Sequence, residues 1–234
     1  MAATAARAQT DYREGLDHYL VSMTRTVGMS VSWALSMFGG RGLAGAQQGP
    51  GDIFLLEPRI NEMEILIDDR AVRLLRDPGI AESDVRQIVA TLKITNDLER
   101  MGDLSVALAE RVVSLAEMGP IKMPPELEPM ITAVSAMVEK SLSALICRNV
   151  TLATEVLESD DLVDRYRDQI FERLMNSMTE SASEVAPGLQ LVLASRYLER
   201  LADHATNIAE DVVFLVEAKM VKHNAYAENG SQRG

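Results

Sequence analysis

The sequence has little of several residue types, and each shortage excludes a class of protein. Cys147 is its only cysteine, so no internal disulfide can form, and a reducing compartment is expected. Aromatic residues make up 4% of the chain and hydrophobic residues 47%, a balance that favours packed helices over sheets. No run of basic residues occurs and the formal charge is −12. A nucleic-acid partner is therefore not expected.

The segments and motifs that mark membrane proteins and many enzymes are also missing. The first ten residues contain no apolar signal core, and no run of about 18 apolar residues occurs. We therefore expect a soluble cytoplasmic protein without a membrane span, whose contact with a membrane is at most peripheral. The sequence contains no HExxH, GxSxG or GxxxxGK[ST] motif and no ExxH pair of the kind found in di-iron enzymes. Nothing marks a nucleophile with a base beside it, so an enzyme is not expected.

What the sequence does contain is hydrophobic periodicity of helical type, interrupted by proline and glycine. Asp77-Pro78-Gly79 and Gly119-Pro120 are breakers, and Pro187-Gly188 is expected to separate the last two helices. The expected fold class is all-α, with six helices. They cover 11–37, 58–75, 82–117, 126–156, 160–187 and the stretch from there to about 221.

A sixteen-residue stretch occurs twice, one hundred residues apart. Residues 98–113 and 198–213 are identical at eight of sixteen positions. Two copies of one unit are therefore expected, each an antiparallel three-helix bundle. The first should cover 1–120, with a glycine-rich insertion near 39–51, and the second 121–222, followed by a polar tail at 223–234.

Each copy of the repeated stretch carries a stripe of acidic side chains. At about 100° per residue, the four second-copy residues fall within roughly 80° of a helix surface, and the first-copy residues do the same. The preceding helices offer further oxygen ligands one turn apart. The candidates are Glu99, Asp103 and Glu110 with Glu57 and Asn61 in the first unit, and Glu199, Asp203, Asn207 and Glu210 with Asp160 and Asp164 in the second.

Two interpretations of these stripes remain open on spacing alone. Periodicity places the acids far from the apolar face, where Arg196 and Arg200 can pair with Glu199 and Asp203 as an ordinary solvated surface. Alternatively, acids from two adjacent helices share an ion. Carboxylates and an amide suit hard or borderline cations such as Fe³⁺, Mn²⁺, Mg²⁺ or Ca²⁺. His204 lies about 140° from Glu199 around the helix, so a surface or packing role is favoured over ligation.

Two segments, KITNDLERMGD at 93–103 and SRYLERLADHATNIAE at 195–210, resemble the paired signatures of the PhoU family of phosphate-signalling regulators. The resemblance implies a cytoplasmic, all-α protein whose E/DxxxD motifs bind metal clusters. It also implies contacts with a phosphate ABC transporter and a sensor histidine kinase, repression of phosphate-starvation genes, and a homodimer. The cofactor would be a divalent or trivalent ion, with iron, manganese, magnesium and zinc as candidates.

The two predicted metal sites differ. The family pattern places an acid at 61 and an asparagine at 107, whereas this chain has Asn61 and Ala107. Pro58 disfavours a helical conformation at Glu57, which would then cap a helix instead of binding metal. Asp160 has a similar explanation without metal, since a carboxylate at a helix start is stabilised by the helix dipole. The second unit nevertheless keeps Asp160, Asp164 and Asn207. The sequence therefore predicts tighter metal binding in the second unit.

The sequence supports one leading function and two alternatives. The leading hypothesis is a metal-binding regulatory adaptor that negatively controls phosphate uptake. The first alternative is a metal-dependent hydrolase or oxidase that uses the same carboxylates, which would require a cleft that excludes water. The second is a metal-free helical scaffold in which Arg100, Arg196 and Arg200 neutralise the acids.

Overall fold

The regular structure is helical throughout the described part of the chain. The computed structural model describes residues 2–38 and 49–217, with side chains from Glu14 onward except that of Asp160. Its elements are α1 (Ala2–Phe38), α3 (Pro50–Leu75), α4 (Glu82–Glu117), α5 (Leu127–Cys147), α6 (Val150–Leu157), α7 (Asp160–Glu180), the 3₁₀ helix η1 (Ala182–Glu184) and α8 (Val185–Glu217). The predicted all-α class is confirmed. Most of the glycine-rich insertion (39–48), the end of the last predicted helix and the predicted tail lie outside the described residues.

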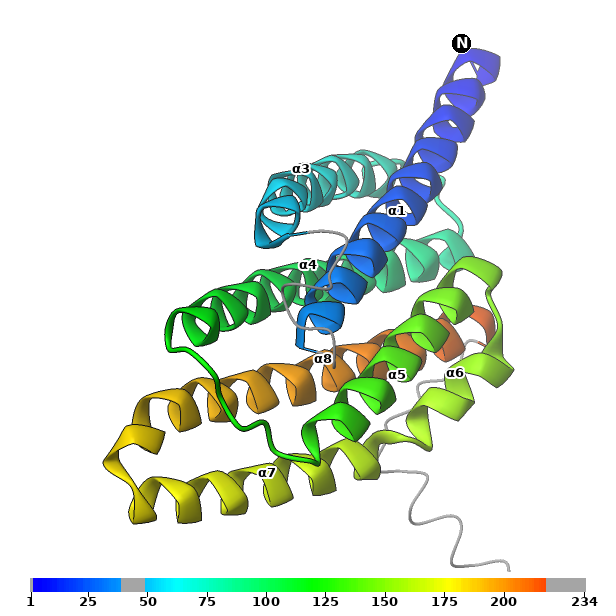
Figure 1. Cartoon of the computed structure of the whole chain (residues 1–234). Coiled ribbons are helices and arrows are strands. Elements are labelled where there is room, and N and C mark those ends of the chain that lie inside the picture. Colours follow the sequence, from blue (N-terminus) through cyan, green and yellow to red (C-terminus); the bar gives the residue numbers. More distant parts are fainter. Residues whose placement is uncertain (1, 39–48, 218–234) are drawn as a thin grey trace, which may run out of the picture.

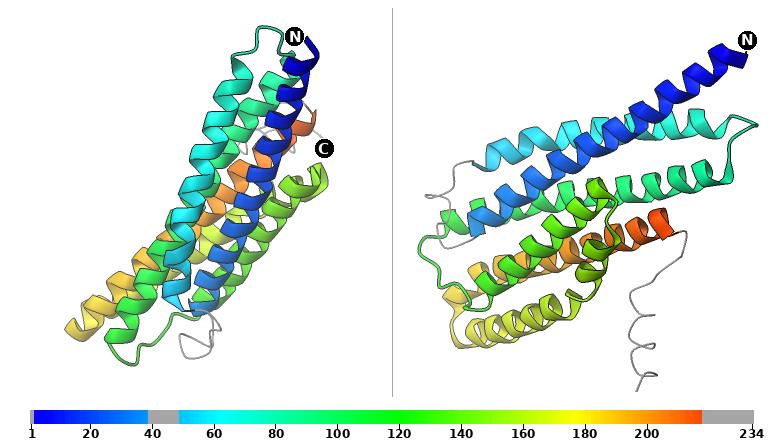
Figure 2. Two further views of the ribbon diagram at one scale, coloured as in Figure 1. Left: turned by 90° about the horizontal axis from the view of Figure 1, so that it is seen from above. Right: turned by 90° about the vertical axis from the view of Figure 1, so that its right-hand side faces the viewer.

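The helices form two three-membered units (Figure 1). In the first, α1, α3 and α4 pack on one another; in the second, α5 and α8 pack with α6 and α7, which together take the place of α3. The two long helices α4 and α8 lie side by side in the middle of the molecule, as Figure 1 and the right-hand view of Figure 2 show. Lys93 contacts Asp211, and Arg111 contacts Gln190, so these helices run antiparallel.

The duplication seen in the sequence reappears in the burial pattern. Positions one hundred residues apart on α4 and α8 are buried in pairs, as are positions 103 apart on α3 and α7. The pairs are Leu98 and Leu198, Met101 and Leu201, Leu108 and Ile208, Ala109 and Ala209, Val112 and Val212, then Ile60 and Val163, and Ile67 and Ile170. These two registers define equivalent positions in the two units.

The predicted fourth helix is wrong in one respect, because it is broken at Arg148 and Asn149. Arg148 adopts a left-handed backbone with φ 49°, which ends α5. The side chain of Asn149 then accepts a hydrogen bond from the backbone N–H of Leu152 and begins α6. The break lets α6 and α7 follow the path that α3 follows in the first unit. It contains no proline or glycine, so the helix breakers on which the prediction relied gave no sign of it.

Two prolines have effects other than those expected. Pro58 was predicted to start a helix, yet α3 begins at Pro50 and passes through Pro58. The buried side chains of Ile53 and Leu56 hold the added turns against the core, and this packing outweighs the local cost of an internal proline. Pro187 does not end α7, which stops at Glu180; it lies in the first turn of α8, where proline is tolerated.

Helix α5 is long and apolar enough to cross a membrane, with a mean hydropathy of 1.5 over its most apolar window. Half of that window is buried inside the bundle, where α5 packs against α8, α6 and α1. Burial of one apolar face against neighbouring helices accounts for its composition, as in the core helix of a helical bundle.

Candidate functional site

Two of the first-unit candidates on α4, Glu99 and Asp103, contact the same arginine. Arg100 Nε lies 3.3 Å from Glu99 Oε2, and Arg100 Nη1 lies 3.4 Å from Asp103 Oδ2. The Glu99 side chain is only 15% exposed, whereas those of Arg100 and Asp103 are about half exposed, at 50% and 43%. Glu99 is therefore more buried than its place opposite the apolar stripe predicted, while its counter-ion is weakly held at the surface.

Glu64 of α3 joins these acids, and sequence reasoning missed it. Burial raises the pKa of Glu64, and the nearby charges of Asp68 and Asp103 raise it further, against the opposing effect of Arg100. The pKa of Glu99 is raised first by burial and then by Asp103, with Glu64 contributing. Negative charge in this cluster is thus incompletely compensated by the single arginine. We call Glu64, Glu99 and Asp103 the first acidic cluster.

Glu57 and Asn61 lie on the same side of α3 as Glu64. Glu57 is helical and does not cap α3, contrary to the sequence-based expectation, and its Oε1 accepts a hydrogen bond of 3.1 Å from Asn61 Nδ2. The Asn61 Oδ1 atom is buried and has no hydrogen-bond partner. A buried acceptor without a donor is costly unless a ligand or water satisfies it. This atom therefore fits a cation held beside the first acidic cluster.

In the second unit the predicted ligands Asp164 and Glu199 come together, but around a guanidinium. Arg167 Nη1 of α7 lies 2.6 Å from Glu199 Oε1 and 3.1 Å from Asp164 Oδ1. The cation that contacts Glu199 is therefore Arg167, not Arg196 or Arg200. Asp203 is exposed on α8, and the side chain of Asp160, the first residue of α7, lies outside the described part.

Asn207 does not join the other second-unit candidates. Its Nδ2 donates a hydrogen bond of 3.2 Å to Asp97 Oδ1 of α4. His204 Nδ1 lies 2.7 Å from the same oxygen, and both side chains of this His204–Asp97 pair are less than one-sixth exposed. His204 therefore has the packing role that was favoured for it, and Asn207 belongs to the contact between the two units.

Glu210 and Glu110 also lie apart from the clusters. Glu210 lines a cavity of about 540 Å³ at the α4–α8 contact, and Glu110 pairs with Arg111 at 3.2 Å. Within the described residues, no three His, Cys, Asp or Glu side chains are spaced to hold a metal ion as they stand. Metal binding in the first unit would require Arg100 to move away and the acids to rotate inward.

Close packing of α3 on α4 brings Glu64 to Glu99, and Gly102 permits it. A Cβ at Gly102 would lie 3.0 Å from Ile60 Cδ1. The second unit has Ala202 and Val163 at the equivalent positions, both 1% exposed. Valine lacks the Cδ1 atom that would meet the added Cβ. Each unit thus packs its two helices closely with a different pair of side chains, Ile60 with Gly102 in the first and Val163 with Ala202 in the second.

This exchange predicts an energetic coupling between positions 60 and 102. Ile60→Val alone should cost about 0.5–1.5 kcal/mol, and Gly102→Ala alone should lose its helix-propensity gain to crowding. The double variant, which copies the second unit, should be more stable than the two single changes predict together, by roughly 0.5 kcal/mol or more. Urea unfolding of the four proteins measures this coupling. Strict additivity would show that the two side chains do not compete for space.

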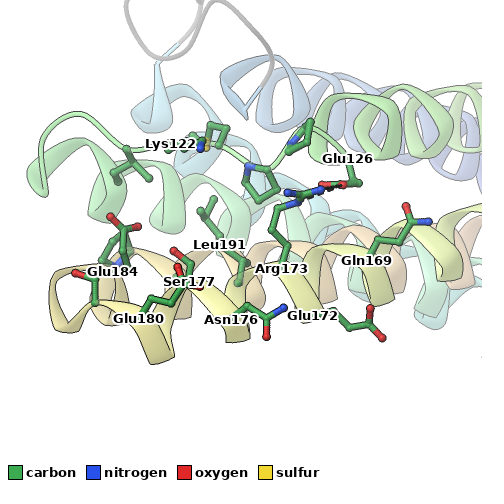
Figure 3. A pocket seen from close by; sticks show the side chains of 18 residues that line it. Lys122, Glu126, Gln169, Glu172, Arg173, Asn176, Ser177, Glu180, Glu184 and Leu191 are labelled. Atoms are coloured by element: carbon green, nitrogen blue, oxygen red, sulfur yellow. Dashed lines mark hydrogen bonds and ion pairs between the residues drawn. The ribbon is translucent and has the colours of Figure 1, made fainter.

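A groove of about 880 Å³ lies at the far end of the second unit, between the α4–α5 connection, α7 and the start of α8 (Figure 3). Arg173 spans one side, with Nη2 2.5 Å from Glu126 Oε1 and Nε 2.9 Å from Oε2. These hydrogen bonds hold the pKa of Glu126 below its ordinary value. None of the predicted metal ligands lines this groove. The ion pair fastens the connection between the units to α7.

These features define a class of protein: a duplicated six-helix bundle, with α6 and α7 counted as one broken helix, whose clustered acids lie on helix surfaces. The PhoU domain model matches residues 21–112 and 127–212. The chain is similar to proteins named phosphate-specific transport system accessory protein PhoU homolog. The one from Clostridium acetobutylicum is 36% identical over 167 residues, which cover 70% of this chain and 76% of that protein. The one from Pseudomonas aeruginosa is 36% identical over 171 residues, which cover 72% of this chain and 70% of that protein. The chain belongs to the PhoU family.

Solved structures agree. The crystal structure of PhoU from Pseudomonas aeruginosa superposes with a TM-score of 0.82 at 30% identity, covering 90% of this chain and 99% of that one. The phosphate transport system regulatory protein PhoU from Streptococcus pneumoniae shares the fold, with a TM-score of 0.77 at 24% identity over 91% and 98% of the chains. The protein is therefore a PhoU-family regulator of phosphate transport.

Proposed function

We propose that this protein is a cytoplasmic, metal-binding adaptor that represses phosphate uptake and phosphate-starvation signalling. It would do so as a homodimer through contacts with a phosphate ABC transporter and a sensor histidine kinase. The PhoU-domain matches to both units support the regulatory role. The relatives in Clostridium acetobutylicum and Pseudomonas aeruginosa carry the name of accessory proteins of the phosphate-specific transport system.

The observation that supports metal binding is the first acidic cluster, whose negative charge Arg100 compensates only in part. Glu64, Glu99 and Asp103 would hold the ion, with the buried Asn61 Oδ1 as a fourth oxygen donor. Three carboxylates and an amide oxygen suit Mn²⁺, Mg²⁺ or iron. A multivalent cation held in this way supplies a positive centre for phosphate or for an acidic group of a partner. The protein groups fix its position and remove the repulsion between their own charges.

The proposal is tested by binding the cytoplasmic region of the histidine kinase with Mn²⁺ or with EDTA. We expect Mn²⁺ to strengthen binding and Glu99→Gln to remove that effect. Glu110→Gln is the matched control, because Glu110 lies on the same helix, is 54% exposed and pairs with Arg111 outside the cluster. Equal kinase binding with Mn²⁺ and EDTA would refute the metal-dependent part. Absence of binding under both conditions would refute the kinase contact.

A further inference from the structure

Arg167 lies where an ion shared by α7 and α8 would lie. Its guanidinium contacts three carboxylates from these two helices. Nη1 bridges Glu199 and Asp164 at 2.6 and 3.1 Å, while Nε and Nη2 lie 3.1 and 2.8 Å from Asp168 Oδ1. The Arg167 side chain is 23% exposed and that of Glu199 only 15%. A planar guanidinium with several N–H donors satisfies carboxylates in fixed directions.

The internal duplication gives a matched comparison for this residue. Position 167 is equivalent to position 64 by the 103-residue register that pairs the buried Ile60 with Val163 and Ile67 with Ile170. The first unit therefore has Glu64 where the second has Arg167. This single difference changes the local charge by two units, from −1 to +1. The first cluster is paired only with Arg100, which is 50% exposed, whereas in the second unit the less exposed Arg167 stands where the first has an acid.

A metal ion in the second unit would meet a fixed positive charge. To enter, it would have to displace Arg167 from Glu199, Asp164 and Asp168 together, leaving a partly buried guanidinium without its partners. Breaking such a pair is unfavourable because the attraction is lost and the partly buried guanidinium is left without a compensating charge. The expectation that the second unit binds metal more tightly rested on Asp160, Asp164 and Asn207, together with the departures of the first unit from the family pattern. Asp164 is held by Arg167, and Asn207 is directed to Asp97 of the other unit.

We propose that Arg167 is a covalently attached counter-cation that replaces a metal ion in the second unit, so that this unit holds its acids together without metal. Any metal dependence of the protein then resides in the first unit. The α7–α8 surface keeps one form whatever the metal concentration, while the α3–α4 surface responds to it. This inference deepens the proposed function by dividing it between a constant and a metal-responsive unit.

The test measures Mn²⁺ uptake by equilibrium dialysis and elemental analysis in a Glu64→Gln background, where the first site is disabled. We expect Glu64→Gln to lose Mn²⁺ binding. The double variant Glu64→Gln/Arg167→Gln should gain a site and bind Mn²⁺ at least about tenfold more tightly than Glu64→Gln, a difference equivalent to 1.4 kcal/mol. Adding Glu199→Gln should remove the gained site. Arg167→Lys keeps the charge and should produce no gain, and neither should Arg173→Gln, which removes an arginine of the same helix that contacts Glu126.

The outcomes separate this inference from the proposed function. Residual Mn²⁺ binding in Glu64→Gln that Glu199→Gln abolishes would overturn the inference, because the second unit would then bind metal with Arg167 present. A folded Glu64→Gln/Arg167→Gln protein, verified by circular dichroism, that gains no site would also overturn it. If the unmodified protein binds no Mn²⁺ but the double variant does, metal binding by the natural chain fails while the role of Arg167 stands.

Discussion

Replacing Leu98 by alanine is expected to lower the free energy of unfolding by about 2–5 kcal/mol, and Leu198→Ala should cost about the same. Both side chains are fully buried, with 0% exposure, at equivalent places beside Glu99 and Glu199. The loss combines the transfer free energy of the removed methyl groups with that of a cavity that helix packing cannot close. For a chain of this size the melting temperature should fall by roughly 5–20 °C.

Each variant should also unfold in one transition. The helices α4 and α8 pack along each other, so a defect in either unit weakens the contact on which both depend. Thermal and urea unfolding, followed by circular dichroism, measure both effects. Leu189→Ala is the matched control, because Leu189 is on α8 but 52% exposed, and its truncation should change stability by no more than about 0.5 kcal/mol. Two separate transitions would show that the units unfold independently.

How much of the fold the sequence predicted depends on what ends each helix. The bounds of α4 agree with prediction at both Glu82 and Glu117, because breakers lie beyond each end and apolar periodicity fills the interval. The break at Arg148 and Asn149 was missed because it depends on one left-handed residue and one side-chain cap. Pro58 led to the opposite error: the helix was predicted to start there, but α3 begins at Pro50 because residues before Pro58 are buried against the core. Local residue types are informative until tertiary packing outweighs them.

The candidate site was predictable where the repeat supplied the pattern. Glu99 and Glu199 recur at the same register, and both are partly buried in ion-pair clusters. Glu64 and Arg167 were missed because the helices that carry them are not recognisably duplicated, and their opposite charges hide the equivalence. The Asp97–His204 pair joins different units 107 residues apart. No spacing rule within one helix predicts a contact of that kind.

Glu64→Gln is expected to be more stable than the unmodified protein without metal and less stable than the unmodified protein with metal. The folded-state pKa values of Glu64 and Glu99 lie above the ordinary value of 4.5. The folded state therefore retains protons that the unfolded state has released, so the contribution of these two groups to stability is fully present below pH 4.5 and is lost as pH rises through their folded-state pKa. Once both groups are ionised, their charges repel each other. Glu64→Gln removes this repulsion, which solvent screening limits to about 0.5 kcal/mol.

Saturating Mn²⁺ should reverse the order of the two proteins. A ligand at one hundred times its dissociation constant raises the free energy of unfolding by about 2.7 kcal/mol, which corresponds to roughly 5–11 °C in melting temperature. Glu64→Gln should lose most of this gain, because it removes one of the carboxylates that hold the ion. Melting curves from pH 4 to 8, in EDTA and in Mn²⁺, test the crossing. Glu180→Gln, an exposed acid on α7, should follow the unmodified protein under both conditions. A Glu64→Gln protein less stable than the original in EDTA at pH 7 would contradict the charge-repulsion argument, because it would mean that Glu64 already has a stabilising partner within the fold.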